Sequence, residues 1–273
     1  MTHLNLTFKT LLKEAQFTKE MLGSGATQIR NANYALKGIY FQAFTSLSTG
    51  LERIGKLCLI TDHYIETNGS FPDLAYMKKE IGHKIVLLYE KSYEVIKRRS
   101  IVLKYLQDLS DPMHQAILRI LHEFAEGDRY SNINLLTGNN CIKDPIAAWY
   151  KQVDLPLFKM CVSERKKQII ARNAIAITKL TGSHIDVFHS SESGSDITDL
   201  EEASNRTGMY KAVIPYRQLY VLQVIRYWAE LLSELGNIAQ QLGKEDIPFF
   251  SELFGFFCNE DTCLRTRKTW YQP

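Results

Sequence analysis

Residues 36–58 read LKGIYFQAFTSLSTGLERIGKLC, and this stretch decides the fold class. Its apolar positions recur at steps of three and four and are Leu36, Ile39, Ala43, Leu47, Leu51, Ile54 and Cys58. That spacing places them on one face of an α-helix, whereas a half-buried strand would alternate apolar and polar residues. We therefore predict one long amphipathic helix here. A break would fall near Gly50 or Gly55, because glycine costs about 1 kcal/mol in a helix interior.

The rest of the chain carries the same helical signature. None of the seven prolines falls in the first 71 residues or between 157 and 214. These gaps leave room for long helices, because proline in a helix interior costs about 3 kcal/mol. Asp111-Pro112 and Asp144-Pro145 are helix-start signals, with Asp as the cap and Pro at the first helical position. We predict an all-α fold with helices at about 4–22, 26–67, 76–109, 112–126, 145–153, 157–180, 215–243 and 247–258.

The order of these segments divides the chain into three parts. Residues 1–110 are predicted to form an up-and-down helical bundle. Residues 111–144 form a connecting helix and a structured loop over 127–140, and residues 145–273 form a second helical set. Residues 191–205 hold five acidic and no basic side chains, so we expect a flexible, solvated linker near 190–206.

Composition excludes several classes of protein. The 273 residues carry 33 basic and 30 acidic side chains, for a formal net charge of +3, and 45% are hydrophobic. These values exclude disorder, collagen and small disulfide scaffolds. No apolar run approaches the roughly 20 residues that span a bilayer, and the five scattered cysteines suit reduced thiols. We predict a cytoplasmic protein without a membrane segment, a metal or a cofactor.

One face of the long helix is polar. Gly38, Thr45, Glu52, Lys56 and His63 fall in a narrow sector opposite the apolar stripe. Glu52 and Lys56 are four residues apart in the order that favours an ion pair, worth about 0.2–0.5 kcal/mol at a helix surface. This face is either solvated or the lining of a polar groove that holds a charge within a bundle.

Two short runs carry a family resemblance. Residues 50–57, GLERIGKL, end a helix rich in aromatic residues, and residues 78–84, KKEIGHK, open the next helix. Over residues 25–110 this arrangement resembles the HEPN superfamily of helical domains, particularly its abortive-infection branches. The resemblance implies an up-and-down bundle, often dimeric, of the kind that serves in phage defence and toxin–antitoxin systems. Many members are metal-independent endoribonucleases.

The resemblance also implies a site. Its catalytic residues would be Glu52, Lys56 and His83, near an RNA-binding groove. Its supporting phosphate ligands would be Arg30, Asn31 and Arg129. A histidine can transfer a proton, and a cation can stabilise the developing phosphorane charge. The family signature of an Arg followed four to six residues later by a His is missing, since the closest pairs are Arg119 with His122 and Arg53 with His63.

A basic stripe lies in the second helical set. Arg165, Arg172 and Lys179 recur every seven residues in a segment, 165–179, that contains no acid. The stripe is either a solvated helix face or a contact surface for RNA phosphates or for the acidic segment 191–205. His114 and His122 are expected on the exposed side of their helix.

Three functions stay open at this point. The first is a HEPN-like protein that acts on or binds RNA, as a homodimer or with a protein partner. The second is a non-catalytic adaptor or structural subunit, because the aromatic residues of 249–257 can form either a core or an interface. The third is a helical module that binds a small ligand or a nucleotide.

Overall fold

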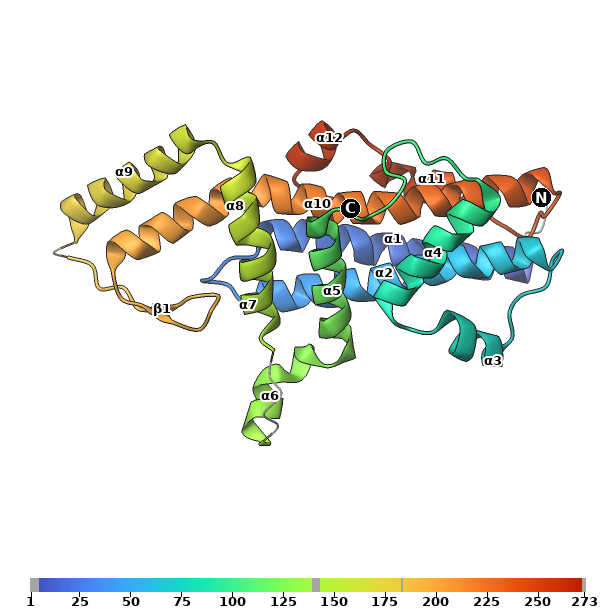
Figure 1. Cartoon of the computed structure of the whole chain (residues 1–273), viewed down its shortest axis with the longest axis horizontal. Coiled ribbons are helices and arrows are strands. Elements are labelled where there is room, and N and C mark those ends of the chain that lie inside the picture. Colours follow the sequence, from blue (N-terminus) through green and yellow to red (C-terminus); the bar gives the residue numbers. More distant parts are fainter. Residues whose placement is uncertain (1–4, 139–142, 183, 272–273) are drawn as a thin grey trace.

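The computed structural model describes residues 5–138, 143–182 and 184–271 (Figure 1). Its first half contains α1 (Leu6–Asn31), α2 (Gly38–Glu66), α3 (Leu74–Tyr76), the π-helical turn η1 (Met77–Ile81), α4 (Ile85–Arg99), α5 (Pro112–Glu126), the 3-10 turn η2 (Asp128–Tyr130) and α6 (Ser131–Leu136). Its second half contains α7 (Pro145–Trp149), the π-helical turn η3 (Tyr150–Asp154), α8 (Leu155–Cys161), α9 (Glu164–Thr181), α10 (Leu200–Gln241), α11 (Phe250–Phe254), the 3-10 turn η4 (Gly255–Phe257) and α12 (Asp261–Thr266). Strands β1 (His189–Ser190) and β2 (Asp196–Ile197) form a short antiparallel pair. The predicted all-α fold is confirmed. The loop predicted over 127–140 is instead helical at η2 and α6, and its residues Asn139 and Asn140 lie outside the described residues.

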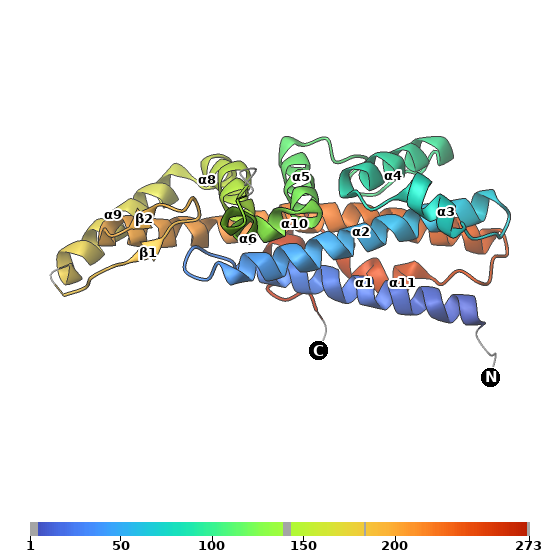
Figure 2. The ribbon, with the colours of Figure 1, turned by 90° about the horizontal axis from the view of Figure 1, so that it is seen from below.

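Three long helices form the body of the molecule (Figures 1 and 2). α1 runs back along α2, and α10 packs beside both. Every residue from 221 to 232 is buried, so α10 is the central helix and is covered on all sides there. One connected cluster of buried apolar side chains extends from Leu11 in α1 to Trp270 near the C-terminus. The boundaries predicted at 110 and 144 therefore do not separate two cores.

Glycines allow the close approach of α1 to α2. A Cβ atom at Gly25 would lie 2.6 Å from Cγ of Leu47, and one at Gly50 would lie 2.7 Å from Cδ2 of Leu22. α2 continues unbroken through Gly50, because packing against α1 compensates for the low helix propensity of glycine. The chain turns at residues 32–37 rather than at 23–25, where the Asn33 side chain accepts hydrogen bonds from the backbone N–H groups of Ala35 and Leu36.

The central helix is longer than predicted. It begins at Leu200 rather than near Pro215, because Asp199 caps it by accepting a hydrogen bond from the Glu202 N–H. Glu201 and Glu202 in its first turn also favour a helix start. Pro215 lies inside α10, where it has no N–H to donate to the carbonyl of Lys211.

The segment near 190–206, predicted as a flexible, solvated linker, carries secondary structure, although most of its residues are exposed. Its first part is the β1–β2 hairpin, and its last part is the first turn of α10. Glu192 is 3% exposed, and its carboxylate accepts a bond from Arg206 Nη1 at 3.3 Å. Of its five acids, Asp199 caps α10 and Glu192 and Glu202 pair with Arg206, while Asp196 and Glu201 are exposed.

The predicted helix at 76–109 is helical only in part. α4 ends at Arg99, where Ser100 adopts the left-handed conformation with φ of 54°. The chain then continues as a loop whose Leu103 and Leu109 are buried in the core. Backbone N–H groups of this loop donate to distant side chains, as Leu109 N–H does to the Tyr89 hydroxyl at 2.8 Å. Tertiary contacts thus replace the helical hydrogen bonds, whereas the neighbouring prediction of 112–126 matches α5.

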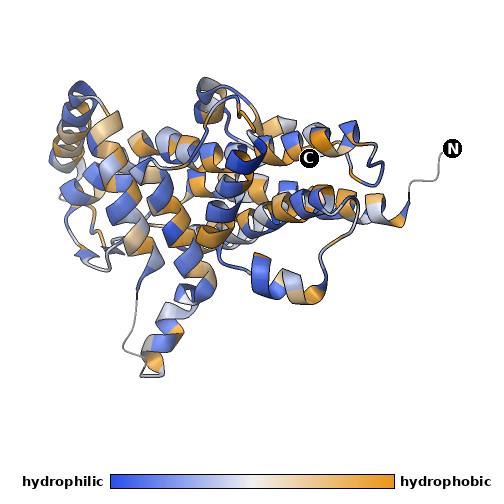
Figure 3. Ribbon diagram, turned by 45° about the vertical axis from the view of Figure 1, so that its right-hand side comes forward, coloured by the Kyte–Doolittle hydropathy of each residue, from blue (hydrophilic) through white to orange (hydrophobic). Residues whose placement is uncertain are grey.

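α9 and the first part of α10 extend together beyond the body as an arm (Figures 1 and 2). Gly208 permits their close contact, since a Cβ there would lie 2.5 Å from Cγ2 of Ile170. Figure 3 shows that many helices carry hydrophobic residues on one side and hydrophilic residues on the other. That pattern is the amphipathic one that the apolar spacing predicted.

The aromatic residues of 249–257 lie mainly in the core. Phe250, Phe254 and Phe257 are at most 1% exposed, and the ring of Phe257 stacks on that of Trp270 with centroids 6.1 Å apart. Only Phe249 is exposed to a large extent, at 52%. These residues therefore support the fold and no longer motivate an adaptor surface.

His114 is buried at 4% exposure, contrary to the prediction of a solvated residue. Its Nε2 lies 2.9 Å from Oε1 of Gln223, whose Nε2 donates to Asp261 at 3.0 Å. Burial lowers the pKa of His114, and the bond to Gln223 and the charge of Asp111 oppose that shift only in part. The folded protein therefore holds His114 neutral more strongly than the unfolded chain does.

We expect this burial to make the fold sensitive to acid. Because the folded-state pKa lies below the unfolded-state value of about 6.5, the unfolded chain binds more protons as the pH falls through that range. The stability that neutral His114 contributes is fully present above the pKa of the unfolded state. It is lost as the pH falls through the pKa of the folded state. In urea titrations, the free energy of unfolding of His114→Gln should be lower than that of the wild type at a pH of about 7.5. This difference should shrink, or change sign, as the pH falls to about 5. A difference that does not change with pH would contradict this assignment.

Among the described residues, no helix is both long enough and apolar enough to cross a membrane. The same residues contain no group of three or more His, Cys, Asp or Glu side chains arranged to hold a metal ion.

Candidate functional site

Two of the predicted catalytic residues lie one turn apart on α2. Lys56 Nζ donates to Glu52 Oε1 at 2.7 Å. The side chains are 18% and 26% exposed, so the pair is half-buried rather than fully solvated. The predicted ion pair is therefore formed, at the edge of the packed body.

The turn after η1 places His83 over this pair. η1 ends at Gly82, whose φ of +73° reverses the chain and is readily adopted only by a residue without a side chain. Ile81 and Ile85 on either side are buried at 4% and 0% exposure and anchor the turn to the core. His83, between these two anchors, is left on the outside with a side chain that is 70% exposed.

The three side chains converge on one point. His83 Nδ1 lies 2.9 Å from Glu52 Oε1 and 2.8 Å from Lys56 Nζ. It can donate to the carboxylate as the Nδ1–H tautomer or accept from the ammonium as the other tautomer. Burial raises the pKa of Glu52, but hydrogen bonds from Lys56 and His83 outweigh it and leave the pKa lowered. Glu52 is therefore ionised at neutral pH and favours the Nδ1–H tautomer, whereas the Lys56 ammonium, which can only donate, favours an Nδ1 without a proton.

This arrangement can support proton transfer. With Nδ1–H held by Glu52, the Nε2 atom of His83 keeps its lone pair, and the ring is largely in solvent. A carboxylate that orients a histidine through Nδ1 is a common way to prepare a general base. Lys56 adds a positive charge beside the ring, where a developing oxyanion would be stabilised.

The surroundings of this cluster carry exposed lysines, the exposed acids Asp73 and Glu80, and aromatic rings. Lys78, Lys79 and Lys84 are exposed, and none forms an ion pair with a carboxylate of the described residues. The rings of His63 and Tyr76 lie 4.5 Å apart at a hollow of about 460 Å³. His63 follows Lys56 by seven residues and so shares its side of α2. We call this surface of Glu52, Lys56, His63, Tyr76, Lys78, Lys79, His83 and Lys84 the α2–η1 face.

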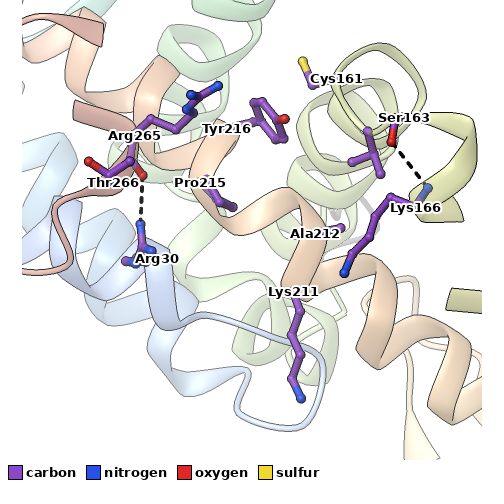
Figure 4. Close-up of a pocket in the computed structure, with 11 residues that line it drawn as sticks. Arg30, Cys161, Ser163, Lys166, Lys211, Ala212, Pro215, Tyr216, Arg265 and Thr266 are labelled. Atoms are coloured by element: carbon purple, nitrogen blue, oxygen red, sulfur yellow. Dashed lines mark hydrogen bonds between the residues drawn. The ribbon is translucent and has the colours of Figure 1, made fainter. Parts of the chain in front are cut away.

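Arg30, a predicted phosphate ligand, lies elsewhere in the molecule. It lines an open pocket of about 520 Å³ between the end of α1, the α8–α9 turn, α10 and α12 (Figure 4). The other cations that line this pocket are Lys166, Lys211 and Arg265, and we call it the four-cation pocket. None of the catalytic candidates lines it. Arg30 is therefore not part of the α2–η1 face.

Asn31 and Arg129 join neither group. The Asn31 side chain donates to the carbonyl of Thr27 one turn earlier in α1. Arg129 is exposed on η2, with its guanidinium 5.0 Å from the ring centroid of the neighbouring Tyr130. Both make local contacts, and neither lies among the residues that line the four-cation pocket.

The basic stripe of α9 faces solvent. Arg165, Arg172 and Lys179 are all exposed, and no ion pair joins them to the described acidic segment 191–205. In that segment Glu192 and Glu202 both pair with Arg206 of α10 instead. Contact between the stripe and RNA stays a prediction.

Sequence reasoning missed most of the four-cation pocket. Lys166 lies within the basic segment 165–179 but outside the predicted stripe of Arg165, Arg172 and Lys179, and no pattern pointed to Lys211 or Arg265. The four cations come from α1, α9, α10 and α12, and each lies in a different sequence context. No sequence signal could have identified these four cations as one site, because no short motif spans residues so far apart.

Comparison with protein-family models, with curated proteins and with solved structures gives no match for this chain.

Proposed function

We propose that this chain is a HEPN-like RNA-binding protein whose working surface is the α2–η1 face, with His83 as the group that transfers a proton. The single observation that carries the proposal is the convergence of Glu52, Lys56 and His83 within 2.9 Å of one another. The phage-defence or toxin–antitoxin setting implied by the resemblance belongs to the same proposal. So does assembly as a homodimer or with a protein partner.

Charge and aromatic rings on this face support RNA as the ligand. Lys78, Lys79 and Lys84 are exposed, form no ion pair among the described residues and can contact phosphates. Of the three, Lys79 lines the hollow, together with Asp73 and Glu80. Tyr76 and Phe71 are 39% and 38% exposed beside them and offer rings on which unpaired bases can stack. A surface with both features suits single-stranded RNA better than a duplex, whose bases are already stacked.

The chemistry proposed for this face is cleavage of the RNA backbone. His83 Nε2 accepts the proton of a ribose 2′-hydroxyl, and the 2′-oxygen attacks the adjacent phosphorus. The bond from phosphorus to the 5′-oxygen then breaks, and that oxygen takes a proton from solvent. Lys56 stabilises the negative charge on the phosphorane, and Glu52 stabilises the protonated His83.

Removing the lysines should weaken binding in a salt-dependent manner. We expect Lys78→Gln, Lys79→Gln and Lys84→Gln combined to lower the affinity for a single-stranded oligoribonucleotide. The slope of log K against log salt should fall in magnitude by about 2, because each phosphate contact on a single strand contributes about 0.7. Fluorescence anisotropy between about 50 and 200 mM salt measures both quantities.

A charge-matched variant controls for net charge. Lys151, Lys159 and Lys268 are exposed and lie outside the α2–η1 face, so their combined change to Gln should leave the slope close to that of the wild type. Equal effects of the two triple variants would show that the binding is not localised on this face.

A further inference from the structure

The four-cation pocket has a charge pattern that the proposed function does not use. Arg30 and Arg265 come from the side formed by α1 and α12, and Lys166 and Lys211 come from α9 and α10 (Figure 4). No aspartate or glutamate lines the pocket. Four cations line one concavity without a lining acid, so the potential there is positive. Figure 4 shows that the ammonium of Lys211 and the guanidinium of Arg265 point away from each other.

The nearest acids in the sequence are already paired with other cations. Glu164, at the start of α9, pairs with Lys167 at 2.7 Å. Asp261, at the start of α12, pairs with Arg226 at 2.9 Å. Among the described residues, none of the four pocket cations forms an ion pair with a carboxylate. The protein therefore leaves this charge uncompensated, although acids lie close by in the chain.

Arg30 is held rigidly without a counterion. Its Nη1 donates to Gln218 Oε1 at 2.9 Å and to the Arg265 carbonyl at 3.3 Å, and both acceptors are neutral. Gln218 is fully buried, and its amide also donates to the Arg267 carbonyl at 2.8 Å. The same glutamine thus positions Arg30 and fastens the α12 segment that carries Arg265. Partial burial of a guanidinium that lacks an acidic partner is compensated when an anion binds.

The pocket also has an apolar wall. Pro215 and Tyr216 of α10 line it between the two pairs of cations, and the guanidinium of Arg265 lies 5.9 Å from the Tyr216 ring centroid. The volume of about 520 Å³ is within the usual range for sites that bind small molecules. The outward-facing residues Arg165, Arg172 and Lys179 do not line it. Lys166 and Lys211 also line a neighbouring hollow of about 280 Å³ between α9 and α10.

We propose that the four-cation pocket binds a small polyphosphorylated ligand, of the class of a nucleoside triphosphate. The phosphate chain spans from Arg30 and Arg265 to Lys166 and Lys211, and the uncharged part of the ligand lies against Pro215 and Tyr216. Cations on two sides of the pocket favour several linked phosphates over one. The site is separate from the α2–η1 face, and this proposal does not rest on the RNA-binding function.

Isothermal titration calorimetry on the full chain tests the proposal with four probes. Tripolyphosphate and ATP are expected to bind, AMP at least tenfold more weakly, and adenosine not measurably, with affinity falling as salt rises. Equal binding of adenosine and ATP would overturn the proposal, because the phosphates would then contribute nothing. No binding of tripolyphosphate or ATP at about 50 mM salt would overturn it as well.

Variants at the two exposed lysines locate the site. Lys166→Ala and Lys211→Ala are each expected to weaken ATP binding about tenfold, since each removes one charge-assisted contact. Their ammonium groups have no hydrogen-bond or ion-pair partner among the described residues, so the melting temperature of both variants should stay at the wild-type value. Lys179→Ala, an exposed residue of the same helix outside the pocket, is the matched control and should bind ATP as the wild type does.

Two outcomes separate this site from the α2–η1 face. His83→Ala should bind ATP with unchanged affinity, whatever it does to RNA. If the Lys166→Ala, Lys211→Ala double variant binds ATP like the wild type but loses affinity for an oligoribonucleotide, the pocket serves RNA and the proposal of a small ligand is wrong.

Discussion

Replacing Asp154 with alanine is expected to lower the free energy of unfolding by about 3–5 kcal/mol, the range measured when one partner of a buried ion pair is removed. The Asp154 carboxylate lies 3.5 Å from Arg217 Nη1, and the two side chains are 4% and 0% exposed. It also accepts bonds from the Tyr40 hydroxyl at 3.3 Å and from Trp149 Nε1 at 3.2 Å. These contacts connect η3 and α7 to α2 and α10 at the centre of the fold.

The expected loss is large because Arg217 would stay charged in the interior. Burial raises the pKa of Asp154, and the guanidinium of Arg217 opposes that rise. Two of the Arg217 nitrogens, Nε and Nη2, have no hydrogen-bond partner among the described residues. Without Asp154, the guanidinium would keep only the Tyr40 hydroxyl, at 3.1 Å.

Urea denaturation of two control variants makes this prediction specific. Glu14→Ala breaks the Arg53–Glu14 pair, whose side chains are 38% and 37% exposed, and should cost less than about 1 kcal/mol. The double change Asp154→Leu with Arg217→Met removes both buried charges and should cost less than Asp154→Ala alone. If Asp154→Ala were as stable as Glu14→Ala, the buried pair would not hold these helices together.

Replacing His83 with alanine is expected to reduce RNA cleavage by about 10²–10⁴-fold, the usual contribution of a general acid or base. The side chain is 70% exposed and its backbone is anchored by neighbours, so the melting temperature should not change. Lys56→Ala should also reduce the rate, because it removes the cation next to the ring. The assay uses a labelled single-stranded oligoribonucleotide with EDTA present, since the proposed chemistry involves no metal.

His184→Ala is the matched control for this experiment, because His184 is exposed and lies outside the α2–η1 face. A toxicity assay in growing cells with the same variants gives a second readout. Unchanged cleavage and toxicity in both His83→Ala and Lys56→Ala would exclude this site. If the wild-type chain binds RNA without cleaving it, the proposed RNA binding stands and the proposed catalysis is wrong.

The contact between Glu52 and Lys56 shows what spacing alone can predict. The Glu52–Lys56 pair follows from helical geometry, because residues four apart on a helix always face each other. In the same way, the apolar steps of residues 36–58 and the Asp-Pro starts were sufficient to predict α2 and α5. The meeting of His83 with this pair was expected only from the family resemblance, and the packing of the segment after α2 brings the residues together.

The extent of α10 shows where such prediction fails. Pro215 indicated a helix start, yet the helix runs through it because Asp199 caps an earlier start and α9 packs against the added turns. The acidic residues before it were interpreted as a solvated linker, although Glu192 is buried beside Arg206. A local preference such as that of proline for a helix start is worth about 1–3 kcal/mol. Tertiary contacts that the sequence pattern does not contain can outweigh it.

The sequence by itself therefore determined the all-α class, most of the long helices and the Glu52–Lys56 pair. These depend on interactions within a few residues along the chain, where periodicity and capping are decisive. Only the tertiary structure decided that Asp154 meets Arg217, that His114 is buried, and that the four pocket cations surround one concavity. Those meetings arise when distant segments bury their apolar faces together, and no local pattern specifies which polar side chains are carried into contact.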